Sequence, residues 1–188
     1  MRSLFIETTL IVLFTLAIYL FEPKASELLA YYHNGIAEGQ IWRLFTATFC
    51  HTNFNHLLMN IAGLIITLGL FIDLFKTIKI FPLMLFSSLF ISLCLFFFEQ
   101  EVIWYVGLSG VLHALFSYGV AHDIARKDPW GYLLGAGFAI KIIYEQIFGA
   151  MQGTIDLIAA PVLINAHLYG AIAGVCFYIV ILKSFKKQ

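Results

Sequence analysis

Charge is scarce in this chain of 188 residues. Only 12% of the residues are Asp, Glu, Lys or Arg, whereas soluble domains carry about 25%. Eleven basic residues balance eleven acidic ones, so the chain has no global field that would attract nucleic acid. Cysteine is also rare, and three cysteines without a CxxC spacing exclude a disulfide scaffold or a cysteine-based metal knuckle. These shortages exclude a soluble enzyme and leave an integral membrane protein.

Long hydrophobic runs are what the chain has instead, and 61% of its residues are hydrophobic. Because a membrane helix needs about 20 apolar residues, the sequence predicts an all-α fold with six transmembrane helices in a single domain, 1–188. The first run is expected to be a retained helix, since it is long and no small-x-small cleavage site follows it before Pro23. The expected spans are residues 4–21, 54–73, 80–98, 105–121, 130–149 and 162–182, with a long loop over 22–53.

Basic residues predict the orientation of these spans. In a six-span arrangement, eight of the eleven lysines and arginines fall on one side of the membrane. Because basic loops stay in the cytoplasm, both termini are expected to be cytoplasmic and loop 22–53 to lie on the outer side. The eight residues are Arg2, Lys76, Lys79, Arg126, Lys127, Lys183, Lys186 and Lys187.

Polar side chains gather where lipid is expected. Spans two, four and six all run from outside to inside, and each begins with polar or small residues, which places them at a similar depth in the outer leaflet. Intramembrane polar groups are costly and indicate function. The residues are His51, His56 and Asn60 in span two, Gly107, Ser109, Gly110 and His113 in span four, and His167, Gly170 and Gly174 in span six.

Small residues predict how two of these spans meet. Gly110 and Ala114 form a small face on span four that matches the Gly170 and Gly174 face of span six, and close packing there would bring Ser109 to His167. A serine beside a histidine suffices for nucleophilic acyl transfer.

The other polar groups of the spans complete this hypothesis. His56 and Asn60 share a helical face and would donate to an oxyanion, with backbone N–H groups at the start of span four. No carboxylate is expected at the depth of the serine, which leaves a Ser-His dyad. Lys141 and Glu145 in span five, four residues apart, are expected to neutralise each other. Neither a metal nor another cofactor is expected.

At these residues the sequence resembles the rhomboid intramembrane serine proteases. The resemblance comprises Trp42-Arg43, His51-x4-His56-x3-Asn60, Gly107-Leu-Ser109-Gly110 and Ala166-His167-x2-Gly170-x3-Gly174, in the family's order. It implies a rhomboid-like bundle with Ser109 as nucleophile and His167 as general base. His56 and Asn60 would be the oxyanion donors.

One departure from the family suggests a subgroup. Many rhomboids have a tyrosine one turn below the serine, where this chain has His113. With this change, six spans and the segment from Gly107 to His113, the chain resembles the rhombosortase subgroup of the family. The resemblance implies a bacterial inner membrane location with the site toward the periplasm. The expected partners are the lipid bilayer and exported proteins with a C-terminal tail composed of a glycine-rich motif, an apolar helix and a basic end.

Other interpretations of the same residues stay open. The chain could be a catalytically silent rhomboid-like protein that binds membrane clients. A histidine-box metalloenzyme is also conceivable from His51-x4-His56, although the six histidines include no adjacent pair. Trp42 and Arg43 are expected to anchor the outer loop, and loop anchoring is as good an explanation of His51 as catalysis. His113 is expected to pack against His167 or to orient it.

Overall fold

The computed structural model describes residues 2–185, with side chains as far as residue 180, and begins with helix α1 (Arg2–Tyr19). Between α1 and the next long helix, α5 (Phe54–Leu70), the chain forms short elements instead of a plain loop. They are α2 (Lys24–Leu29), β1 (Tyr31–Tyr32), α3 (His33–Ala37), α4 (Arg43–Thr46) and the 3₁₀ turn η1 (Ala47–Phe49). The loop expected over 22–53 is therefore largely structured.

The rest of the described chain consists of helices joined by turns and loops, with one short strand. Its elements are α6 (Ile72–Phe75), α7 (Ile80–Phe98), β2 (Trp104–Tyr105), α8 (Ser109–Ala125), α9 (Pro129–Phe148), α10 (Gln152–Ile158) and α11 (Ile164–Phe185). Strand β1 pairs antiparallel with β2, with Tyr31 opposite Tyr105. This pairing ties the outer segment between α1 and α5 to the chain that leads into α8.

The predicted fourth span, 105–121, was wrong at its start. The apolar residues before Ser109 suggest a helix, but Tyr105 belongs to β2 and Gly107 has a φ of 118°. This left-handed conformation, which glycine adopts without a steric penalty, cannot occur inside an α-helix. Helix α8 therefore begins at Ser109, at the residue expected to be the nucleophile.

Several described helices are suited to a membrane by length and composition. Helices α1 and α7 could each cross it alone. The pair α4–η1 with α5, bent by 95°, and the pair α9 with α10, bent by 84°, pass the same test together. Helix α11 contributes a shorter apolar stretch, Ile164–Val180. These helices support an integral membrane protein, as the composition predicts.

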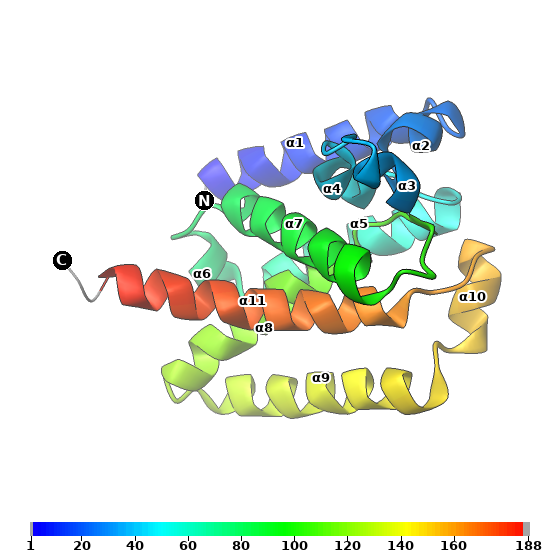
Figure 1. Ribbon diagram of the computed structural model, residues 1–188. Coiled ribbons are helices and arrows are strands. Elements are labelled where there is room, and N and C mark those ends of the chain that lie inside the picture. The colour runs from blue at the N-terminus through cyan, green and yellow to red at the C-terminus, as the bar shows by residue number, and fades with distance from the viewer. Residues whose placement is uncertain (1, 186–188) are drawn as a thin grey trace.

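The helices form a bundle whose two ends differ. Figure 1 shows the start of α1 and the end of α11 on one side of the bundle and α10 on the other. Lys186 and Lys187, on which part of the orientation prediction rests, lie outside the described residues, as does the side chain of Lys183. Both described chain ends thus lie away from the end where α8 and α11 begin.

Close packing of α8 against α11 positions the two elements that matter most for the site. A Cβ atom added to Gly170 would lie 2.0 Å from the carbonyl oxygen of Gly110, and one added to Gly174 would lie 2.1 Å from that of Ala114. No side chain fits at either position, so the two backbones touch directly. The predicted contact between the small faces of these spans is confirmed.

Apolar side chains also cover the outside of the bundle. On α9, Leu133, Ile140 and Ile147 are each more than 60% exposed and are spaced seven residues apart, so they form one apolar face of the helix. Such an apolar face is unfavourable in water and suits contact with lipid. The opposite side of α9, toward α8 and α11, carries Lys141 and Glu145.

Candidate active site

Ser109 and His167 meet where α8 and α11 begin. The Ser109 hydroxyl oxygen lies 3.1 Å from His167 Nε2, as the packing of the small faces predicts. Ser109 is the first residue of α8, so the unpaired N–H groups and positive dipole end of that helix lie beside its hydroxyl. This geometry allows the imidazole to accept the serine proton.

The prediction that no carboxylate lies near the serine and histidine was wrong. Glu145 Oε2 lies 3.0 Å from His167 Nδ1, on the opposite side of the ring from Ser109. Helix α9 provides this carboxylate because its last turns run beside the first turns of α8 and α11. The sequence contained a usable signal: in the six-span arrangement, span five ends on the outer side, so Glu145 reaches the depth of Ser109.

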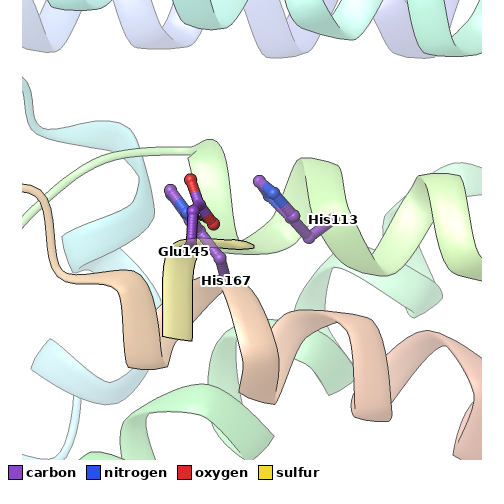
Figure 2. A group of neighbouring side chains, drawn as sticks. All are labelled: His113, Glu145 and His167. Carbon is purple, nitrogen blue, oxygen red and sulfur yellow. Dashed lines mark hydrogen bonds and ion pairs between the residues drawn. The ribbon is translucent and has the colours of Figure 1, made fainter. Parts of the chain in front are cut away.

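Lys141 joins the same cluster. Its ammonium lies 2.7 Å from Glu145 Oε2, so the two residues form the expected ion pair, and it also contacts His113 Nε2. Figure 2 shows His113, Glu145 and His167 gathered at one place from α8, α9 and α11. The ion pair is therefore part of the site and not a separate neutralised pair on α9.

His113 stacks on His167. The two ring centroids are 4.1 Å apart and the ring planes differ by 8°. His113 Nδ1 lies 2.7 Å from the carbonyl oxygen of Ser109, one turn earlier in α8. His113 thus occupies a stacking position against the His167 ring, which lies beside the serine.

The family model of the rhomboid domain matches residues 38–184, more than three quarters of the chain. The chain belongs to the rhomboid family. Members of this family are generally intramembrane serine proteases that act on membrane proteins within the bilayer. A comparison with curated proteins gave no match.

A cavity of about 550 Å³ in this rhomboid opens onto the serine and is also lined by His56 and Asn60. Asn60 is 4% exposed, and its side-chain nitrogen has no hydrogen-bond partner among the described residues. Gly107 makes room for the neighbouring imidazole, because a Cβ atom there would lie 2.8 Å from His56 Nε2. Two side chains of α5, His56 and Asn60, thus line the same cavity as Ser109.

The N-terminal segment of α5 is fastened to α10. The Asn53 side chain caps α5 by accepting from the backbone N–H of His56 at 2.8 Å. Thr52 Oγ1 donates to the carbonyl oxygen of Ile158 at 2.7 Å and lies 3.1 Å from His56 Nδ1. The backbone N–H of Thr52 donates to His56 Nδ1 at 3.5 Å, which leaves the hydrogen of the ring on Nε2. The Asn53 and Asn55 amides both donate to the carbonyl oxygen of Leu157. These bonds hold α10 over the cavity, a feature that the sequence did not reveal.

The remaining motif residues of this rhomboid fasten the outer segment. Arg43 is buried and donates to the carbonyl oxygens of Ala30 and Glu27 at 2.7 and 2.8 Å, and the Trp42 indole donates to that of Leu28 at 3.0 Å. His51 is buried, and its ring lies 4.9 Å from that of His56. Trp42 and Arg43 thus tie the start of α4 to α2, and neither lines the cavity at Ser109.

Proposed function

We propose that this rhomboid is an intramembrane serine protease that cleaves a peptide bond in or beside the transmembrane segment of a membrane-anchored protein. The observation that carries the proposal is the 3.1 Å contact between Ser109 Oγ and His167 Nε2 in a cavity of about 550 Å³. A nucleophile and a base within hydrogen-bond reach are the minimum for acyl transfer.

The proposed reaction has two halves. His167 Nε2 takes the Ser109 proton while Oγ forms a bond to the carbonyl carbon of the substrate, and the imidazolium then protonates the leaving amine as the peptide bond breaks. A water molecule, or an amine, next gives a proton to His167 and attacks the acyl carbon, and His167 returns that proton to Ser109 Oγ as the ester bond breaks. His167 carries the proton in both halves.

The oxyanion of each tetrahedral intermediate is assigned to Asn60, His56 and the first N–H groups of α8. Asn60 has an unpartnered buried amide nitrogen, and its side chain lines the cavity together with that of Ser109. Donors held in place before the reaction stabilise a developing negative charge most effectively. Helix α8 also presents its positive dipole end at Ser109.

We further propose six membrane crossings with both termini in the cytoplasm. The two additional crossings are assigned to α8, which has 17 residues, and to α11, whose apolar stretch is Ile164–Val180; both pack against other helices. The excess of basic residues at Arg2, Lys76, Lys79, Arg126 and Lys127 supports this orientation. The cavity then faces the outer, periplasmic side of a bacterial inner membrane.

The proposed substrate follows from the rhombosortase-like motif with His113. It is an exported protein with a C-terminal tail that combines a glycine-rich segment, an apolar helix and a basic end. Small residues near the cleaved bond suit the site because glycine lowers the cost of unwinding a substrate helix. They also fit a cavity enclosed by α5, α8, α9, α10 and α11.

A cleavage assay in bacterial membranes tests the proposal. The reporter carries the glycine-rich tail, and a matched reporter replaces the glycines with leucine. Wild-type protein should cleave the first reporter, while Ser109→Ala and His167→Ala should cleave neither. A fluorophosphonate probe should label wild-type protein at Ser109 only. If the probe labels Ser109 but the reporter stays intact, the substrate proposal is wrong; if Ser109 is not labelled, the chain is a silent member.

A further inference from the structure

The Lys141 ammonium lies among three side chains of the site. It contacts His113 Nε2 and lies 2.7 Å from Glu145 Oε2 and 3.4 Å from His167 Nδ1. These three partners belong to three different helices, α8, α9 and α11. One cation therefore links the helix that carries the serine to the helix that carries the histidine.

The hydrogen bonds fix the proton positions on both stacked rings. The carbonyl oxygen of Ser109 can only accept, so His113 Nδ1 must donate to it, and His113 Nε2 must accept from Lys141. In the same way the Glu145 carboxylate accepts from His167 Nδ1. His167 Nε2 is then left without a hydrogen and can accept the serine proton. The cluster thus selects the form of His167 that acts as a base.

The ion pair also makes the carboxylate tolerable at this position. Only 12% of the Glu145 side chain is exposed, and α9 turns an apolar face outward. A carboxylate with so little exposure is destabilising unless it is paired and hydrogen-bonded. Lys141 supplies the opposite charge, and its side chain is 41% exposed. Because Lys141 neutralises its charge, Glu145 can accept the hydrogen bond from His167 Nδ1 without adding a net negative charge between the helices.

The same three partners have the chemistry of a metal site. Ligand atoms of His113, Glu145 and His167 all lie within 4.8 Å of one another, and two histidines with a carboxylate are common zinc ligands. A metal bound to His167 Nδ1 would take the place of the hydrogen that faces Glu145. The single hydrogen of the neutral ring would then lie on Nε2, which could no longer accept the serine proton. The Lys141 ammonium fills the place among His113, Glu145 and His167 that a metal ion would take, and it leaves the hydrogen on His167 Nδ1.

Building on the proposed protease function, we propose that Glu145 and Lys141 are positioning residues that make the reaction centre a Ser109–His167–Glu145 triad with a built-in cation. Glu145 holds the tautomer and orientation of His167. Lys141 holds Glu145 and His113, and it keeps metal ions away from the two rings.

The first test measures how fast a fluorophosphonate probe labels Ser109 in membranes, together with kcat and KM for reporter cleavage. Glu145→Gln should lower the labelling rate and kcat by about 10²–10⁴-fold and leave KM nearly unchanged. The double variant Lys141→Met with Glu145→Gln removes both charges and keeps the helices neutral. It should melt close to wild type and still react as slowly as Glu145→Gln.

A matched control uses another carboxylate that reaches α11. Glu99 accepts from the Asn165 amide and the Tyr169 hydroxyl, each at 2.7 Å. Glu99→Gln should lower the melting temperature without a comparable loss of kcat. A double variant that is stable and labels at the wild-type rate would overturn the proposal while leaving the serine protease intact. If wild-type Ser109 is not labelled at all, the proposed function fails and this inference fails with it.

The second test adds zinc to the same labelling reaction. In Lys141→Met the three partners of the ammonium become available, so micromolar zinc should slow labelling and a chelator should restore it. Lys141→Gln serves the same purpose if the methionine variant does not fold. Wild type should resist the same zinc concentration, and the double variant, which lacks the carboxylate, should resist it too. Equal inhibition of wild type and Lys141→Met would contradict the role of Lys141 as the built-in cation.

Discussion

The rings of His113 and His167 lie parallel, with centroids 4.1 Å apart and planes inclined by 8°. The two rings come from different helices, α8 and α11, whose backbones touch at Gly110 and Gly170. His113 is also hydrogen-bonded to the carbonyl oxygen of Ser109. One side chain therefore supports the orientation of the proposed base and connects it to the residue proposed as the nucleophile.

Replacing His113 separates its stacking function from its hydrogen bonds. His113→Phe keeps an aromatic ring against His167 but cannot accept from Lys141, whereas His113→Ala loses both interactions. We expect Ser109 labelling to be slower in both variants and slowest in His113→Ala. Rates measured on membranes with equal amounts of folded protein check this order. Equal rates for wild type and His113→Ala would show that the stack does not support catalysis.

The oxyanion assignment predicts a kinetic defect without a folding defect. Asn60→Ala should lower kcat by about 10²–10³-fold, because one preorganised donor to the tetrahedral intermediate is lost. Its side-chain nitrogen has no hydrogen-bond partner among the described residues, so the melting temperature should change little. Asn34→Ala, on α3 and away from the cavity, is the control. An unchanged kcat in Asn60→Ala would restrict the oxyanion site to His56 and backbone donors.

The contact between α8 and α11 predicts that Gly170 tolerates no side chain. In Gly170→Ala the new Cβ atom would meet the carbonyl oxygen of Gly110 at 2.0 Å, so the helices must separate. We expect a destabilisation of about 1–3 kcal/mol or more and loss of Ser109 labelling. Thermal unfolding in detergent measures the first effect.

Gly137 provides the matched control for that substitution. It lies on α9, and a Cβ atom there would have no neighbour within 4 Å. Gly137→Ala should therefore stabilise the protein by about 0.5–1 kcal/mol, because alanine loses less backbone entropy in a helix. If both alanine variants melted at the same temperature, direct backbone contact between α8 and α11 would be refuted.

Arg43 is expected to be important for stability, since it is only 6% exposed. Its guanidinium donates to the carbonyl oxygens of Ala30 and Glu27 and to the side-chain oxygen of Gln40. Arg43→Lys keeps the charge but cannot present the same fork of donors. We expect a loss of about 1.5–3 kcal/mol per charged hydrogen bond that is broken, seen as a lower melting temperature. The labelling rate of the protein that remains folded should be close to wild type. A lysine variant as stable as wild type would contradict this assignment.

Local sequence patterns predicted the apposition of Ser109 and His167 well. Small residues spaced four apart on two apolar segments leave few ways to pack them, and the observed contact at Gly110 and Gly170 follows that rule. The start of α8 was less predictable, because the apolar letters before Ser109 do not reveal a short strand and a left-handed glycine.

Glu145 was missed for a different reason. Its spacing from Lys141 allows a local ion pair, and that explanation accounts for both charges without any third partner. Whether a side chain of α9 also reaches α11 depends on how the helix rotates against its neighbours, which one sequence does not determine. A comparison of the depth of polar residues in all six expected spans, including the fifth, which runs from inside to outside, would have placed Glu145 at the depth of Ser109.

The hydrogen bonds between α10 and the N-terminal segment of α5 couple the position of α10, at the edge of the cavity, to that of His56, which lines it. Thr52 donates to Ile158 in α10, and its oxygen lies 3.1 Å from His56 Nδ1. Any displacement of α10 that breaks the Thr52 bond to Ile158 would also loosen the segment that holds the His56 ring beside the cavity. Access to the cavity and the position of one proposed oxyanion donor are therefore set by the same few hydrogen bonds.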